Sequence, residues 1–198
     1  MSFPSDEEIR ALHEKYAPTA EVFELVHTHC RIVREIAEQL VTTNRLAVDL
    51  DLVRAGSLLH DIGVYRLYDA AGELDVKDYV RHGILGEELL RELGFPEALC
   101  RVCSHHTGVG ISRDDIERQQ LPLPPCDFVA ESVEEELVMY ADKFHSKRGV
   151  GVFVGAETYA AGVLRYGPDK VSKFAELRQR YGVPELAALS QAYGHPLI

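Results

Sequence analysis

The sequence predicts an all-α protein, a helical bundle formed by a single domain. Apolar residues recur at the three- and four-residue spacing of amphipathic helices, and no stretch shows the strict alternation of a half-buried strand. Capping residues, prolines and glycines divide this pattern into separate helices. A chain of 198 residues has the length of one domain with one substantial core. We therefore expect residues 1–198 to form one domain.

Composition and charge limit the partners and the location that we expect. Hydrophobic residues make up 46% and charged residues 27% of the chain, as in soluble globular proteins. The net charge of −11 argues against a duplex nucleic acid or an anionic membrane as partner, since both need a basic surface. There is no signal-peptide pattern, the longest apolar run (150–156) is too short to cross a bilayer, and cysteines are few. These features predict a cytoplasmic protein.

The first two helices are predicted from their caps and apolar stripes. Ser5 and Glu8 have the spacing of a capping box for a short leading helix. Pro18 opens a longer helix, whose apolar stripe places His29 on the inward face and His27 roughly away from it.

Asp49 is expected to cap a third helix, which is apolar until it ends in His60-Asp61. Gly63 follows as the expected left-handed cap of that helix, and residues 63–75 form a long loop. An imidazole and a carboxylate at an apolar helix end are costly to bury without a partner. A metal ion would stabilise both groups, and the alternative is an ordinary helix C-terminus, which favours His.

Two further helices are predicted next. One covers 82–94, where Gly83 and Gly86 leave one face without side chains, so that another backbone can approach closely. Pro96 starts the other, on which His106 lies on the inward stripe.

The rest of the chain is expected to hold a covering segment and more helices. Residues 108–131 are rich in proline, with one short helix capped by Ser112. Ser132 and Glu135 have the spacing of a second capping box, for a helix that reaches Asp142. Additional helices are expected over 157–166 and after Pro168 and Pro184.

Six inward-facing candidate ligands come from different predicted helices or helix ends, as a site in the middle of a bundle requires: His29, His60, Asp61, His82, His106 and Asp142. Their order resembles the HD-domain superfamily of metal-dependent phosphohydrolases, whose signature is H…HD…D. The stretch Ala55-Gly56-x-Leu58-Leu59-His60-Asp61-Ile62-Gly63 is similar to the HD motif, and His29-x3-Val33-x3-Ala37 to the first helix of the family. The motifs His82-Gly83-x2-Gly86, His106-Thr107-Gly108 and Ala141-Asp142-Lys143 follow in the expected order.

This resemblance covers about residues 20–148 and implies an HD-type core, with 149–198 as a helical extension packed on the same core. It implies one metal held by His29, His60, Asp61 and Asp142. A second would be held by His82 and His106, with Asp61 bridging the two, as in the branch of the family with a binuclear site. One or two divalent transition metals are expected, and Fe, Mn, Ni, Co and Zn all remain open.

The resemblance also implies a small phosphorylated substrate. Asp61 is expected to act in catalysis by bridging the metals, and Lys143 by reaching a substrate phosphate. Lys147 is expected to bind substrate with Lys143, although a lysine here also suits a helix C-terminus. His105 is expected either to support a ligand or to face the substrate. A homodimer is left open.

The function predicted is a phosphohydrolase that cleaves a phosphate ester or anhydride of a nucleotide or another small phosphorylated metabolite with a metal-activated water. Two alternatives use the same residues. One is an HD-type di-iron oxygenase, for which Tyr16 and Glu21 have the wrong spacing to His29. The other is a nucleotide-sensing module without catalysis, which would suit a degenerate ligand set, and no ligand position is missing here.

Overall fold

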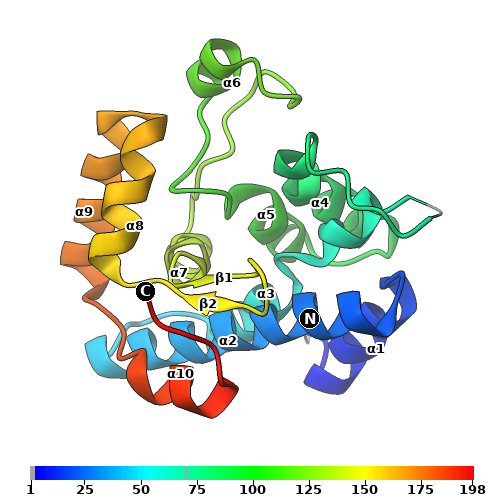
Figure 1. Ribbon diagram of the computed structural model, residues 1–198, viewed down its shortest axis with the longest axis horizontal. Coiled ribbons are helices and arrows are strands. Elements are labelled where there is room, and N and C mark those ends of the chain that lie inside the picture. Colours follow the sequence, from blue (N-terminus) through cyan, green and yellow to red (C-terminus); the bar gives the residue numbers. More distant parts are fainter. Residues whose placement is uncertain (1–2, 70) are drawn as a thin grey trace.

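The computed structural model describes residues 3–69 and 71–198 and confirms the all-α prediction (Figure 1). Residue 70, inside the predicted loop 63–75, lies outside the described residues. The elements in chain order are α1 (Asp6–Tyr16), α2 (Ala20–Asn44), α3 (Leu50–Leu59), η1 (Ile62–Leu67), η2 (Tyr79–Arg81), α4 (His82–Glu92), α5 (Glu97–His105), α6 (Arg113–Gln119), α7 (Val133–Asp142), β1 (His145–Ser146), β2 (Val152–Phe153), α8 (Ala156–Val163), η3 (Leu164–Tyr166), α9 (Pro168–Tyr181) and α10 (Ala187–Tyr193).

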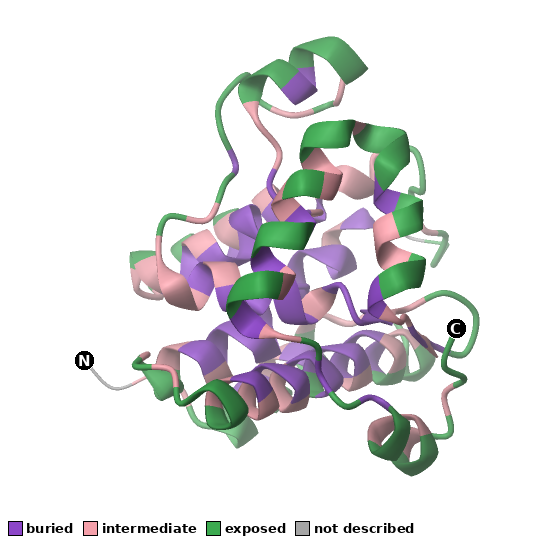
Figure 2. Cartoon of the chain, turned by 90° about the vertical axis from the view of Figure 1, so that its left-hand side faces the viewer, coloured by how far each residue is buried: buried purple, intermediate pink, exposed green. Residues whose placement is uncertain are grey.

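Helix α2 is the longest element, and both parts of the core include residues from it. Its C-terminal half packs with α7 and α9 in one buried cluster that includes Ile36, Tyr140 and Phe174. Its N-terminal half packs with α1, α3, α4 and α5 in a second cluster that includes Val26 and Leu90. Figure 2 shows these buried residues on the inner helices, while α6 stands away from the core and is largely exposed.

The residues after 149 bury side chains in the same core cluster as α2 and α7. Phe153, Phe174 and Leu177 are almost fully buried there. This packing agrees with an extension that lies on the shared core, and the division of the chain near residue 149 stays a prediction. Among the described residues, no helix has both the length and the apolar composition needed to cross a membrane.

The predicted helix starts are largely confirmed. The side chains of Ser5, Asp49 and Ser112 accept hydrogen bonds from the first turns of α1, α3 and α6, and Pro168 occupies the first turn of α9. Ser132 caps α7, but the carboxylate of Glu135 accepts a hydrogen bond from Glu131 N, so the box is not reciprocal. These caps satisfy amide groups that have no partner within the helix.

Predictions for α10 and for His27 are wrong. Helix α10 begins at Ala187 and not at Pro184, because the side-chain amide of Gln39 pairs with both backbone groups of Glu185. His27 is buried, since α1 packs over that side of α2 and the imidazole stacks on Phe23 with the ring centres 5.0 Å apart. A two-stranded antiparallel pairing of β1 with β2, which no alternation predicts in so short a segment, also forms.

Gly63 does not act as a left-handed cap. Helix α3 ends at His60 in right-handed geometry, and Gly63 lies within η1. A methyl group at Gly63 would overlap the carbonyl oxygen of His82 and the backbone nitrogen of Gly86. The predicted close approach at Gly83 and Gly86 is confirmed, since a methyl group at either glycine would crowd Cys103 of α5. The three glycines therefore set how closely η1, α4 and α5 approach.

We expect Gly63→Ala to lower the free energy of unfolding by about 3 kcal/mol, because the added methyl group meets backbone atoms that no rotamer change can move. Thermal and urea denaturation measure this change. Gly162→Ala is the control, since among the described residues outside its own helical turn no atom lies within 4 Å of a methyl group at that position. Equal stability of the two variants would contradict the close packing inferred at Gly63.

The buried imidazole of His13 predicts that stability depends on pH. Its Nδ1 lies 2.8 Å from Tyr65 Oη and its Nε2 lies 2.8 Å from Leu58 O, so the neutral ring is fully hydrogen-bonded. Burial lowers the pKa of His13 to about 4. Below its ordinary pKa of 6.5, the unfolded chain binds a proton that the folded chain refuses, so acid destabilises the fold.

We expect His13 to account for a loss of about 2 kcal/mol in the free energy of unfolding between pH 7 and pH 5. Urea denaturation of the metal-free chain at a series of pH values measures the loss. His13→Gln keeps polar groups at this position and removes the titration, so its pH dependence should be weaker by that amount. An unchanged slope in this variant would overturn the assignment.

Candidate metal centre

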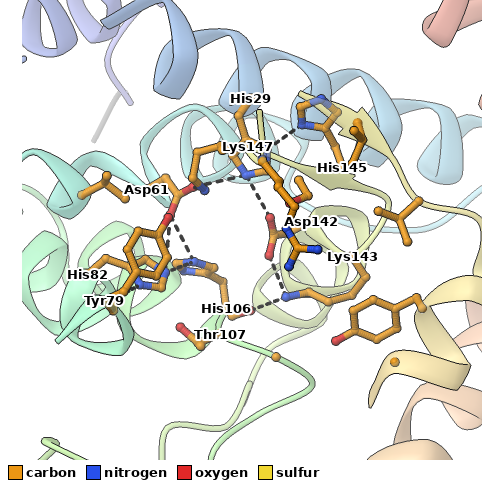
Figure 3. Close-up of a pocket in the computed structure, with 18 of the residues that line it drawn as sticks. His29, Asp61, Tyr79, His82, His106, Thr107, Asp142, Lys143, His145 and Lys147 are labelled. Atoms are coloured by element: carbon orange, nitrogen blue, oxygen red, sulfur yellow. Dashed lines mark hydrogen bonds and ion pairs between the residues drawn. The ribbon is translucent and has the colours of Figure 1, made fainter. Parts of the chain in front are cut away.

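Six of the predicted site residues converge on one buried point. Figure 3 shows His29, Asp61, His82, His106 and Asp142 pointing into it from different elements. His29 lies in the middle of α2, His60 and Asp61 follow the end of α3, His82 begins α4, His106 caps α5, and Asp142 ends α7. All of these residues except His29 lie at helix ends, where side chains from differently oriented helices can point to a common centre.

Asp61 lies between two groups of ligand atoms. On one side, His29 Nε2 is 3.2 Å from Asp61 Oδ2 and 3.0 Å from Asp142 Oδ1, and His60 Nε2 is 3.2 Å from His29 Nε2. On the other side, the Nε2 atoms of His82 and His106 are 3.0 Å apart and lie 3.4 and 3.6 Å from Asp61 Oδ1. One carboxylate therefore offers an oxygen to each group.

The hydrogen bonds of three imidazoles decide which ring nitrogen carries the proton. The Nδ1 atoms of His60, His82 and His106 lie 2.7, 2.7 and 2.6 Å from the carbonyl oxygen three residues earlier in the chain. A carbonyl only accepts, so in the neutral ring Nδ1 carries the proton and Nε2 keeps a lone pair. Backbone partners of this kind fix the tautomer of metal-binding histidines.

The lone pairs then face one another and two carboxylates, which is the donor set of a divalent transition metal. Two such Nε2 atoms 3.0 Å apart, as in His82 and His106, repel each other unless a cation lies near both. Asp61 Oδ1 is buried and has no hydrogen-bond partner among residues 3–69 and 71–198. Both observations fit a metal. Ligand atoms lie within 4.8 Å of one another in two sets of three residues: His29, His60 and Asp142, and His60, Asp61 and His106.

The charge states also suit metal binding. Burial lowers the pKa of His82 to about 3 and also lowers the pKa of His106, so both rings are neutral. Burial alone would raise the pKa of both carboxyl groups. The neighbouring Lys147 ammonium holds the pKa of Asp61 well below its usual range, and the Lys143 ammonium does the same for Asp142. The carboxylates are therefore ionised.

Two of the residues predicted to bind substrate lie at the centre and are already ion-paired. Lys143 is buried and donates to Asp142 Oδ2 at 2.6 Å and to the His106 carbonyl oxygen at 3.1 Å. Lys147 donates to Asp61 Oδ2. Each lysine therefore touches a candidate metal ligand, while both also line the open space above it.

His105 is not brought to this centre. Its Nδ1 lies 2.9 Å from Arg101 O and 2.6 Å from Ser104 Oγ, and its ring faces Phe128. The side chain turns toward the covering segment because consecutive residues at the end of α5 point in different directions. His105 is absent from the lining of the cavity, so the structure lends no support to a substrate contact there.

A cavity of about 800 Å³ opens above the cluster. This volume is in the range of small-molecule sites. Its floor is the histidine and aspartate cluster, and its walls come from the segment after η1, from β1 and β2, and from α8 and η3. The walls carry cationic, aromatic and aliphatic side chains, among them Lys143, Lys147, Arg148, Tyr68, Tyr79, Tyr159, Val163 and Tyr166.

Sequence reasoning missed two contributors to the site. The walls formed by α8 and η3 depend on how the last third of the chain folds back, which no local pattern reveals. His145 lies 2.8 Å from His29 through the Nδ1 atoms of the two rings. A histidine three residues after a predicted ligand was the available signal, but the contact itself depends on tertiary structure.

Comparison with known proteins identifies relatives along much of the chain. It is 39% identical over 130 residues to an uncharacterized protein of Methanocaldococcus jannaschii, MJ0778, covering 63% of this chain and 70% of that protein. It is 32% identical over 123 residues to a tRNA (cytidine(56)-2'-O)-methyltransferase of Picrophilus torridus, and 32% over 114 residues to one of Thermoplasma volcanium. These matches cover 62% and 58% of this chain, but only 32% and 30% of the two methyltransferases, so the chain spans about a third of their length.

Among solved structures, the HD domain of the L. monocytogenes phosphodiesterase PgpH has a similar fold, with a TM-score of 0.53 and 14% sequence identity over 95% of this chain and 100% of that one. The same domain in complex with cyclic-di-AMP matches over 93% and 96%, also with a TM-score of 0.53 and 14% identity. The family model described as the HD domain matches residues 26–147, which is more than half of the chain and includes all six clustered residues. The chain belongs to the HD-domain family.

Proposed function

We propose that this chain is a metal-dependent phosphohydrolase that cleaves a phosphate ester or anhydride of a nucleotide or another small phosphorylated metabolite. The observation that carries the proposal is the position of Asp61, which offers one carboxylate oxygen to each of two ligand groups. These groups lie at the floor of a cavity that is also lined by lysine and arginine side chains. Membership of the HD-domain family supports the same chemistry.

In this proposal His29, His60, Asp142 and Asp61 Oδ2 hold one divalent metal, and His82, His106 and Asp61 Oδ1 hold a second. Bound metals of this kind supply Lewis acidity and lower the pKa of a bound water toward neutrality. The Nδ1 hydrogen bonds of His60, His82 and His106 keep their Nε2 atoms directed to the centre. The metal identity stays among Fe, Mn, Ni, Co and Zn.

The cationic side chains bind the phosphoryl group. The chain carries a net charge of −11, so attraction of an anionic substrate has to come from local charge. Lys147 lies against Asp61, where the reacting phosphate would be held, and Lys143 is anchored by Asp142 and His106 O. Arg148, which is exposed, also lines the cavity. The apolar and aromatic wall of α8 and η3 receives the organic part of the substrate.

Asp61→Asn tests the shared carboxylate. The amide has one acceptor oxygen and no charge, so we expect the metal content to fall and the rate of phosphate-ester or anhydride hydrolysis to drop by at least about 100-fold. Elemental analysis measures the metal content, and chromatography of the products formed from a panel of nucleoside mono-, di- and cyclic phosphates measures the hydrolysis. Asp114→Asn, on the exposed face of α6, is the matched control.

Full metal content and turnover in Asp61→Asn would contradict the proposed role of Asp61. If the metal-loaded native chain hydrolyses no phosphate ester or anhydride of the panel, the phosphohydrolase proposal falls. Dioxygen consumption by the iron-loaded chain would favour the oxygenase instead.

Lys147→Met tests the contact with the phosphate. Removing one charge-assisted hydrogen bond should lower kcat/KM by about 10- to 100-fold, mostly through KM, while the metal stays bound. Lys147→Arg should recover part of this loss because it restores the charge. Lys15→Met, on the surface of α1, controls for the change in net charge. A variant with native KM would exclude Lys147 from substrate binding.

A further inference from the structure

His29 differs from the other three histidines of the centre in how its outer nitrogen is held. The Nδ1 atoms of His60, His82 and His106 each use a backbone carbonyl three residues earlier. His29 lies in the middle of α2, where the backbone carbonyls already accept the hydrogen bonds of the helix. Its Nδ1 has to find a partner elsewhere, and that partner is Nδ1 of His145 at 2.8 Å.

A second hydrogen bond continues outward from His145. Its Nε2 lies 2.9 Å from Nδ1 of His195, and the two rings stack with their centres 5.2 Å apart. Each neutral imidazole has one donor and one acceptor nitrogen. If His29 Nε2 keeps its lone pair for a metal, then His29 Nδ1 donates to His145, and His145 Nε2 must in turn donate to His195. The tautomers of His29, His145 and His195 are therefore linked through these two hydrogen bonds.

The surroundings of His195 are built to hold its ring. Segment 194–198 runs beside β2, with Phe153 N donating to Pro196 O at 2.8 Å and Ile198 N donating to Phe153 O at 3.0 Å. Gly151 has φ +98°, and a methyl group there would lie 2.6 Å from Nδ1 and Cε1 of His195. The glycine therefore leaves the space that the imidazole fills, and β1 carries His145 next to it.

We propose that His145 and His195 are positioning residues that fix the tautomer and ring orientation of His29, so that docking of segment 194–198 raises the metal affinity of the centre. The inference rests on the metal centre of the proposed function and not on the reaction that it performs. Because coupling between two binding events is reciprocal, a bound metal also strengthens docking of the segment.

The deciding variants change only the acceptor at position 195. His195→Phe keeps a ring in the space beside Gly151 but cannot accept a hydrogen bond, whereas the side-chain oxygen of His195→Gln can. We expect His195→Phe to bind Co²⁺ about 3- to 10-fold more weakly than the native chain, and His195→Gln to bind it with nearly native affinity. His145→Phe should lower the Co²⁺ affinity by about 10- to 100-fold. Chelator competition measures the affinities, and the visible spectrum of bound Co²⁺ reports any change in ligand geometry.

A direct measurement of the tautomers avoids any dependence on the stability of variants. Long-range ¹⁵N–¹H correlation spectra of the Zn²⁺-loaded full chain should show the proton of His145 on Nε2 and that of His29 on Nδ1. Leu197→Ala, a change at an exposed position of the same segment, is the control and should bind Co²⁺ like the native chain.

Several results would overturn the inference: a proton on Nδ1 of His145, native affinity in His195→Phe, or equal losses in His195→Phe and His195→Gln, which would mean that only packing matters. Failure to bind any metal would overturn both this inference and the proposed function. The expected affinities and tautomers in a chain without phosphatase activity would overturn the proposed function alone.

Discussion

Imidazole lone pairs and two carboxylates meet in a volume from which water is largely excluded, and such a cluster is stable only with positive charge at its centre. The rest of the fold serves this requirement. Asp61 has to stand between His29 and His60 on one side and His82 and His106 on the other, within 3.2–3.6 Å of their Nε2 atoms. Only a close approach of η1, α4 and α5 brings the second pair near enough. The glycines at 63, 83 and 86 permit that approach.

Under the proposed function, the cluster also explains how an acidic protein could attract an anionic substrate. Lys143 pairs with Asp142 and Lys147 pairs with Asp61, so in the structure the two ammonium groups neutralise these carboxylates. Metal charge at the same carboxylates would compete with these ammonium groups and leave them available to the cavity. The field that a substrate meets is therefore set by a few buried groups, whereas the net charge of −11 describes mainly the outer surface.

Much of this arrangement could be predicted from the sequence, because local chemistry determines it. Caps such as Ser5 and Asp49, the inward stripe that carries His29, and the glycine face of α4 depend on residues a few positions apart. Features that depend on distant segments were not predictable. Gly63 is needed for contact with α4 and not for a cap, His27 is covered by α1, and His105 turns toward Phe128. The cavity wall of α8 and the partner of His29 belong to the same class, since both require the last third of the chain to be in place.

The position of the ligands along the chain has a consequence for the order of assembly. His29 and Asp142 are separated by more than a hundred residues, and only His60 and Asp61 are neighbours in sequence. The unfolded chain therefore cannot bring these six ligands together locally, and closing such long loops in advance is entropically costly. Assembly of this centre therefore follows folding, unlike the coupled folding and binding of small zinc modules. A newly made chain would reach its native topology with Lys143 and Lys147 paired to the two carboxylates, and it would acquire the ion afterwards through the cavity above the centre.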